Sequence, residues 1–248
     1  MPPLVIAHRG DSARRPENTL ASFASALEVG ADFLEFDVQL TRDSQVVVLH
    51  DATVDRTTDG AGRVQDLTLV ELRRLSAGYP ARFGDAYRGE RVPTLAEVLG
   101  LIRDRAIGMI EIKHDSVTAD AEGGIEAHTL AEVRKAGMEK QVALISFSRV
   151  ALVRCRELAP AIPRGHLFVR AEVGEMLAGA REVASTLVLP EKGTLSVELR
   201  DRAREAGVRV ATWVVDDPAE LAALAHFDLY GIGSNRPGEM MEALRGEG

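Results

Sequence analysis

Apolar, strand-like runs alternate with amphipathic helical stretches along the whole chain, and this alternation limits the possible fold more than any other feature of the sequence. Eight runs have the composition of buried strands: residues 4–7, 33–38, 107–112, 142–146, 164–168, 186–189, 208–213 and 227–232. Stretches with helical periodicity lie between them, and Gly137 and Gly207 each separate a helix from the next strand. This pattern predicts parallel strands joined by helical crossovers.

The number of strand–helix units favours a closed α/β barrel, the TIM (β/α)8 barrel, over an open doubly wound sheet, which is the alternative. The length of 248 residues fits, since such a barrel needs about 250 residues. Apolar residues make up 46% of the chain, which is enough to fill a large core. We therefore expect one domain that spans residues 1–248.

Residues suited to helix ends lie at the expected boundaries. Asn18 is placed to cap the first helix and Gly30 to end it. Thr94 and Glu97 form the pattern of a capping box, in which each side chain binds the backbone N–H of the other residue. These signals support the helices that the periodicity predicts.

Residues 52–91 interrupt the alternation, because this stretch is rich in glycine and arginine and has little helical or strand periodicity. One short helix is expected in it, beginning at a capping box of Thr68 and Glu71. We expect a small insertion at the carboxyl-terminal mouth of the barrel. Long insertions at such a place are commonly lids or binding loops, and a purely structural excursion is the alternative.

Composition narrows the classes of partner. The chain has 30 basic and 38 acidic residues and a net charge of −8, which argues against nucleic acid. It lacks the run of about 18 apolar residues that a membrane-spanning helix needs, and no basic leader precedes its first apolar run. We therefore expect a cytoplasmic protein without membrane insertion, whose oligomeric state the sequence does not indicate. The single cysteine, Cys155, lies in an apolar helical pattern that favours a buried thiol over a nucleophile.

Acidic side chains occur where two of the predicted strands end. Glu35 and Asp37 are two residues apart and therefore point to the same face, as do Glu111 and Lys113. Active sites of α/β barrels form at the carboxyl ends of the strands, so these residues are expected to converge there. Three acids in one interior repel one another unless a cation or protons compensate, and we expect one divalent cation. Ligation by carboxylate oxygens alone suits Mg²⁺ or Ca²⁺ better than zinc.

Two of the six histidines are candidate catalytic residues. His8 follows the first apolar run, and His50 closes the stretch 46–49 and is followed by Asp51, which either fixes the ring tautomer or simply ends a strand. Two imidazoles beside one divalent metal are sufficient to cleave a phosphodiester. The remaining histidines are weaker candidates: His114, His128 and His226 have surface or helical contexts, and His166 is expected to face the barrel interior without neighbouring acids.

Ordered motifs along nearly the whole chain resemble those of the glycerophosphodiester phosphodiesterases, a family of α/β barrels. The motifs are His8-Arg9-Gly10, Pro16-Glu17-Asn18-Thr19, Glu35-Phe36-Asp37-Val38, His50-Asp51, Asp55-Arg56-Thr57-Thr58-Asp59-Gly60, Val92-Pro93-Thr94-Leu95, Glu111-Ile112-Lys113, Ser146-Phe147 and Trp213-Val214-Val215. Two positions depart from the family pattern. Members commonly have an acid in the loop of the last strand, where this chain has Gly233-Ser234-Asn235-Arg236-Pro237, and they often have asparagine where it has Asp216.

The resemblance implies metal-dependent hydrolysis of glycerophosphodiesters, such as glycerophosphocholine or glycerophosphoethanolamine, to glycerol 3-phosphate and an alcohol through a cyclic phosphate. The implied roles are metal ligands at Glu35, Asp37 and Glu111, phosphate-binding side chains at Arg9 and Lys113, and general acid and base at His8 and His50. Trp213 ends a strand and is expected either to form a wall of the substrate pocket or simply to pack in the core. Two alternatives are a phospholipase-D-like activity on lysophospholipids and a non-catalytic binding protein on the same scaffold.

Overall fold

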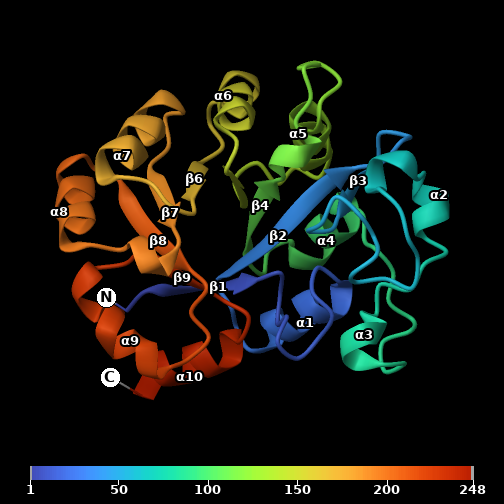
Figure 1. Ribbon diagram of the computed structural model, residues 1–248, viewed down its shortest axis with the longest axis horizontal. Helices are drawn as coiled ribbons and strands as arrows, with labels where there is room; N and C mark the ends of the chain where they lie inside the picture. The colour runs from blue at the N-terminus through green and yellow to red at the C-terminus, as the bar shows by residue number, and fades with distance from the viewer. Residues whose placement is uncertain (1, 247–248) are drawn as a thin grey trace.

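The protein, described over residues 2–246 by a computed structural model, is a closed barrel of parallel strands surrounded by helices (Figure 1). Within that range the barrel strands are β1 (Leu4–His8), β2 (Phe33–Leu40), β4 (Ile107–Ile112), β5 (Val142–Ser146), β6 (Arg164–Phe168), β7 (Leu187–Pro190), β8 (Arg209–Trp213) and β9 (Gly231–Ser234). They pair in the order β1-β9-β8-β7-β6-β5-β4-β2, and β1 also pairs with β2, which closes the ring. The predicted TIM barrel is confirmed, and the open-sheet alternative is wrong.

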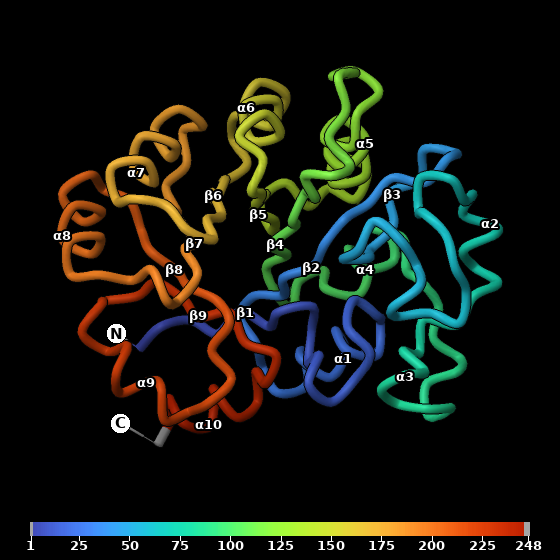
Figure 2. The backbone as a smooth tube through the Cα atoms, viewed as in Figure 1, coloured from blue at the N-terminus to red at the C-terminus, as the bar shows by residue number. Residues whose placement is uncertain are grey.

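A helix follows each barrel strand and covers the outside of the ring, as the backbone trace in Figure 2 shows. These helices are α1 (Leu20–Glu28), α4 (Leu95–Ile102), α5 (Ile125–Lys135), α6 (Arg149–Leu158), α7 (Val173–Glu182), α8 (Val197–Glu205), α9 (Ala219–Leu224) and α10 (Pro237–Gly246). Short 3-10 turns accompany some of them: η2 (His114–Ser116), η3 (Lys192–Thr194) and η4 (Ala225–Phe227). No helix among the described residues has the length and apolar character needed to cross a bilayer.

Strand periodicity divides the core into an inner and an outer layer. Side chains such as Met109, Ile145 and Leu167 fill the barrel interior, while Phe36 lies outside it, fully buried against α1 and edge-on to Phe23 at 5.6 Å between ring centroids. Burying one such apolar side chain stabilises a fold by about 1.5–3 kcal/mol. The alternation therefore forces the intervening residues of β2, the acids, into the interior.

The boundaries of two elements differ from the sequence-based expectation. The last strand begins at Gly231 rather than at residue 227, because residues 225–227 form η4 and Asp228 follows in a left-handed conformation with φ of 54°. Thr19, not Asn18, caps α1, since the Thr19 hydroxyl accepts the N–H of Ser22. The capping box of Thr94 and Glu97 on α4 is present as predicted.

The segment between β2 and α4 contains more structure than expected. Strand β3 (Val46–Val48) pairs antiparallel with β2, and η1 (Val64–Asp66), α2 (Leu69–Leu72) and α3 (Pro80–Phe83) follow. The predicted capping box begins α2, whereas the four-residue α3 is too short to leave a periodic signal. A small apolar cluster around Val47, Val54 and Leu72 holds the segment together. Arg82 ties it to the loop after β1 by donating to the backbone oxygens of Ser12 and Ala13, both at 2.9 Å.

Candidate active site

A cavity of about 170 Å³ lies among residues at the carboxyl ends of the barrel strands. One side is polar and includes His8, Glu35 and Glu111, and the other is apolar. Strand register brings the polar residues together, because β1 and β2 pair His8 with Glu35, and β2 and β4 pair Asp37 with Glu111. Each predicted site residue except Asp37 lines this cavity: His8, Arg9, Glu35, His50, Glu111, Lys113 and Trp213.

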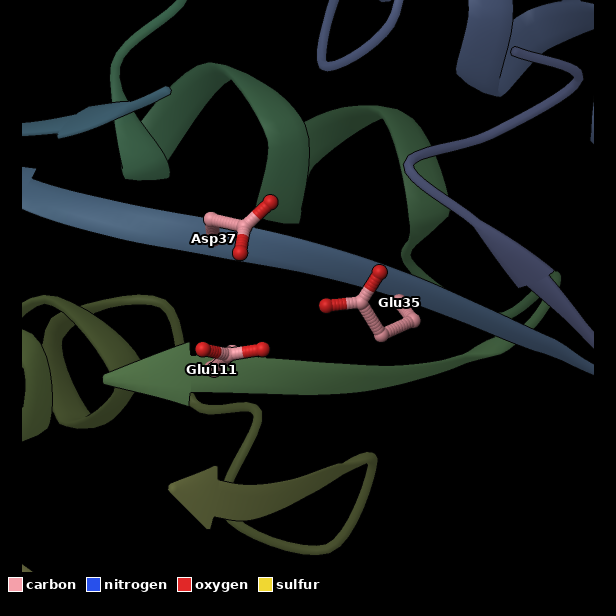
Figure 3. Close-up of side chains that lie close together, drawn as sticks. All are labelled: Glu35, Asp37 and Glu111. Carbon is pink, nitrogen blue, oxygen red and sulfur yellow. The ribbon is translucent and has the colours of Figure 1, made fainter. Parts of the chain in front are cut away.

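Three carboxylates form a compact cluster beside the cavity. Glu35 and Asp37 on β2 and Glu111 on β4 each offer an oxygen, and these oxygens lie within 4.8 Å of one another. Figure 3 shows the three side chains facing one another across the two strands. All three are buried, with exposed fractions of 5%, 1% and 8%. Such a set of oxygen donors is a candidate site for a metal ion.

Burial and mutual repulsion make the fully ionised cluster costly. Burial, with the charges of Asp37 and Glu111, raises the pKa of Glu35 well above its ordinary value. The pKa of Glu111 is raised to about 7 by burial and by the charge of Asp37. Asp37 is the exception, since Arg9 and Lys113 outweigh its burial and hold its pKa below the usual range. A bound cation would remove the repulsion that the first two groups experience.

Two cationic side chains adjoin the carboxylates. The Nζ of Lys113 lies 2.8 Å from Glu111 Oε1 and 3.3 Å from Asp37 Oδ1. Arg9 lies across the cluster, with Nε 3.5 Å from Asp37 Oδ2, and its backbone N–H donates to Glu35 Oε2 at 3.1 Å. Both cations therefore sit where an anionic phosphate beside a metal ion would find positive charge.

A sharp turn after β1 brings Arg9 into this position. Arg9 and Gly10 both have positive φ, 58° and 84°. A Cβ atom on Gly10 would lie 2.5 Å from Ser22 Oγ, so glycine is required at the second position for both conformation and space. In the motif His8-Arg9-Gly10, the glycine is therefore needed for the turn that places the chemically important Arg9.

His8 is neutral in the folded protein. Burial first, and then the charge of Arg9, lowers the pKa of His8 to about 4. Its Nδ1 lies 2.7 Å from Asn235 Oδ1, which leaves Nε2 as the ring nitrogen for the cavity. A neutral imidazole with an unprotonated nitrogen at the cavity can accept a proton.

His50 is held by a chain of charged groups from the segment that follows it. Its Nδ1 lies 2.6 Å from Asp51 Oδ1, and Arg56 binds Asp51 through Nε at 2.6 Å and Nη2 at 3.0 Å. The hydrogen bonds from Arg56 hold the pKa of Asp51 down to about 2, so this carboxylate is ionised. Arg56 also binds both oxygens of Glu17 at 2.8 Å, and Glu17 binds Arg9 at 2.9 Å.

Several residues of the site were not predicted from the sequence. The motifs quoted above contain Glu17, Asn18 and Arg56, but their spacing predicted no role in the active site. Asn18, expected as a helix cap, instead has a φ of 57° and donates its amide to Asp37 Oδ2 at 2.8 Å. Phe147 also lines the cavity, edge-on to Trp213 at 5.8 Å.

The predicted direction of the His166 side chain is wrong. His166 does not face the barrel interior: its ring lies 4.2 Å from that of Phe168 between centroids, tilted by 43°, and against Gly179 of α7. The inward positions of β6 belong to the alternate residues, including Leu167, whose side chain packs in the barrel core. His166 is therefore a buried residue between the barrel and a helix.

The two places that depart from the family pattern lie in contact, through Asn235 of the last strand's loop and Asp216. Asn235 donates Nδ2–H to Asp216 Oδ2 at 2.7 Å, and its backbone N–H donates to Asp216 Oδ1 at 2.7 Å. The loop after β8 and the end of β9 are joined by this pair. The amide of Asn235 therefore contacts His8, and the acid contacts that amide.

The fold and the site together define a class of protein, the (β/α)8-barrel hydrolases whose site combines clustered carboxylates, cationic side chains and two histidines. The chain belongs to the glycerophosphoryl diester phosphodiesterase family, because the sequence model of that family matches residues 8–239. It is therefore an enzyme of the phosphoric diester hydrolase class.

Individual relatives agree with this assignment over almost their full lengths. The glycerophosphodiester phosphodiesterase of Caldanaerobacter subterraneus subsp. tengcongensis is 38% identical over 99% of each chain. That of Bacillus subtilis is 32% identical over 94% of this chain and 84% of its own. A solved structure of an Oleispira antarctica phosphodiesterase in complex with the product sn-glycerol-3-phosphate has a TM-score of 0.89 and 29% identity, and covers 98% of this chain and 97% of its own.

Proposed function

We propose that this chain hydrolyses glycerophosphodiesters to glycerol 3-phosphate and an alcohol with the help of one divalent cation. The observation that carries the proposal is that two cations and two histidine rings line one cavity, beside a cluster of three carboxylates of which Glu35 and Glu111 line it too. The relative from Oleispira antarctica, which holds sn-glycerol-3-phosphate, supports a substrate of this kind. The substrate class proposed is small deacylated phospholipids such as glycerophosphocholine and glycerophosphoethanolamine.

The carboxylate cluster fits a hard cation, Mg²⁺ or Ca²⁺. Glu35 Oε1 is buried and has no hydrogen-bond partner among the described residues, and the raised pKa of Glu35 is what an uncompensated acid would show. Glu35, Asp37 and Glu111 would hold the ion through oxygen atoms alone. When bound, it supplies positive charge that stabilises the phosphoryl oxygens in the transition state.

The two histidines carry opposite roles in the proposed first step. His8 accepts the proton of a glycerol hydroxyl at Nε2, since its Nδ1 is engaged with Asn235. The freed oxygen attacks phosphorus, the bond to the alcohol breaks, and His50 gives its proton to the departing oxygen. The ionised Asp51 beside Nδ1 suits a His50 ring that is positively charged at this stage. Because the nucleophile belongs to the substrate, much of the entropic cost of a bimolecular attack is avoided.

The second step reverses these roles. A water molecule gives a proton to His50 and attacks the cyclic phosphate, the phosphorus bond to the glycerol oxygen breaks, and His8 returns its proton to that oxygen. Both rings then regain their starting states. Arg9 and Lys113 bind phosphate oxygens throughout, and Trp213 and Phe147 form the apolar wall against which the carbon chain of the substrate lies.

The experiment that tests the proposal compares substrates and products. The protein is incubated separately with glycerophosphocholine and with lysophosphatidylcholine in the presence of Mg²⁺ or Ca²⁺, and glycerol 3-phosphate, lysophosphatidic acid and choline are measured. We expect faster turnover of glycerophosphocholine, with equal amounts of glycerol 3-phosphate and choline. A higher rate on the lysolipid would favour a phospholipase-D-like enzyme, and binding without turnover of either substrate would favour the non-catalytic alternative.

A further inference from the structure

The ring of His8 contacts the side-chain amide of Asn235, which can present either its oxygen or its NH₂ group to the ring. Nδ1 of His8 lies 2.7 Å from Asn235 Oδ1, an oxygen that accepts hydrogen bonds and cannot donate one. The hydrogen of the neutral ring must therefore be on Nδ1, and Nε2 carries the lone pair. If the amide of Asn235 were turned over, its NH₂ group would face Nδ1 and the ring would have to adopt the opposite tautomer.

Asp216 fixes the orientation of the Asn235 amide. Its Oδ2 accepts from Asn235 Nδ2 at 2.7 Å, while its Oδ1 accepts from the Asn235 backbone N–H at 2.7 Å and from Ser234 Oγ at 3.0 Å. A carboxylate has no hydrogen to donate, so only the NH₂ end of the amide can face it.

We infer that Asp216 and Asn235 are positioning residues which fix the tautomer of His8 with the hydrogen on Nδ1, so that Nε2 is free to accept a proton from substrate. The inference deepens the proposed function and rests on it for the catalytic consequence, while the tautomer itself is a property of the resting protein. Neither residue lines the cavity directly, so both act through His8.

A purely structural brace between the β8 and β9 loops would make a different prediction. The strength of such a brace depends on how many hydrogen bonds join the two loops. The positioning role depends instead on a carboxylate, which can only accept hydrogen bonds, facing the amide of Asn235. In Asp216→Asn the new NH₂ group meets the NH₂ group of Asn235, and the conflict is relieved by turning the Asn235 amide over. In the double variant Asp216→Asn/Asn235→Asp the carboxylate lies next to His8 and again accepts from Nδ1–H.

The tautomer is measured first, without reference to activity. Protein labelled with ¹⁵N at its six histidines is studied by two-bond ¹H–¹⁵N correlation near pH 7.5, and the His8 signals are assigned by their loss in His8→Gln. We expect a protonated Nδ1 in the wild type, a reversed or averaged pattern in Asp216→Asn, and recovery in the double variant. Asp217→Asn is the matched control, since it makes the same charge change and the exposed Asp217 side chain bonds only to the N–H of Ala219 among the described residues.

Turnover of glycerophosphocholine by the same variants gives the second readout. We expect kcat of Asp216→Asn to fall by about 10²-fold with KM changed less than about threefold, and the double variant to recover most of the loss. An unchanged His8 pattern and rate in a folded Asp216→Asn would overturn the inference, as would a double variant that folds and remains as slow as the single one. A wild type with the predicted tautomer but no turnover would instead count against the proposed function alone.

Discussion

Neutralising one acid of the carboxylate cluster should stabilise the metal-free protein and remove its response to metal. We choose Glu35→Gln because Glu35 has a raised pKa and an unpaired oxygen, and glutamine keeps the same shape. In metal-free protein the substitution removes a source of repulsion. In metal-loaded protein it removes a ligand, so the sign of the effect on stability reverses.

The magnitudes follow from the spacing of the oxygens. Two unit charges 4.8 Å apart repel by about 3.5 kcal/mol at an effective dielectric constant of about 20. Arg9 and Lys113 already offset part of this, so we expect a gain of about 1–2 kcal/mol, or roughly 2–8 °C in Tm, for the metal-free variant. Cation at about 100 times its Kd should stabilise the wild type by about 2.7 kcal/mol, or roughly 5–11 °C.

Thermal unfolding in chelator and in excess Mg²⁺ or Ca²⁺ measures both effects. We expect Glu35→Gln to melt above the wild type in chelator and to shift little with metal, while the wild type shifts strongly. The control is Glu126→Gln on α5, another fully buried glutamate, which is paired with Arg154 at 3.2 Å outside the cluster and should destabilise the protein with or without metal. If Glu35→Gln melts below the wild type in chelator, repulsion at Glu35 does not destabilise the metal-free protein. If it keeps the full shift in Tm with metal, Glu35 is not a metal ligand.

Three further predictions concern other parts of the molecule. Arg56→Lys loses the paired hydrogen bonds to Asp51 and Glu17, so we expect kcat on glycerophosphocholine to fall about tenfold with a smaller change in KM; an unchanged kcat would mean that Arg56 does not position His50. Burial lowers the pKa of His166 to about 4, whereas the same side chain in the unfolded chain has a pKa near 6.5. Between pH 6.5 and pH 4 the unfolded chain therefore binds a proton that the folded protein does not, and the free energy of unfolding falls as pH falls through this range. His166→Leu should therefore lose less stability between pH 7 and pH 5 in urea unfolding, and an identical loss in both proteins would contradict this. Burial raises the pKa of the Cys155 thiol to about 12, so iodoacetamide should label Cys155 in urea and spare it in the folded protein, and rapid labelling of folded protein would be the contrary result.

The parts of this structure that follow from local periodicity could be predicted from the sequence. Residues two apart on a strand share a face, which was enough to place Glu35 and Asp37 together. Glycines after α5 and α8, Gly137 and Gly207, have the left-handed φ of 63° and 67° expected at helix ends. Eight such units favour the closed barrel but do not by themselves decide against an open doubly wound sheet, because helices cover both faces of the strands in either arrangement.

Contacts between distant segments could not be predicted in this way. Asn235 reaches His8 across 227 residues and Arg56 reaches Glu17 across 39, and no local pattern specifies such pairs. The direction of His166 was missed for a related reason, since its short strand has apolar residues on both faces and so gives no alternation to read. Asn18 was misread because one residue type suits both a helix cap and the left-handed conformation it has here.

The proposed reaction requires a cation that the carboxylate cluster holds beside the two histidines. The most direct test is release of glycerol 3-phosphate from glycerophosphocholine by metal-stripped protein, before and after Mg²⁺ or Ca²⁺ is added back, with Glu35→Gln measured in parallel. We expect no release without metal, restored release with one of these ions, and little release by the variant under either condition. Full activity of the stripped wild type, or none with either ion from protein shown to be folded, would contradict it.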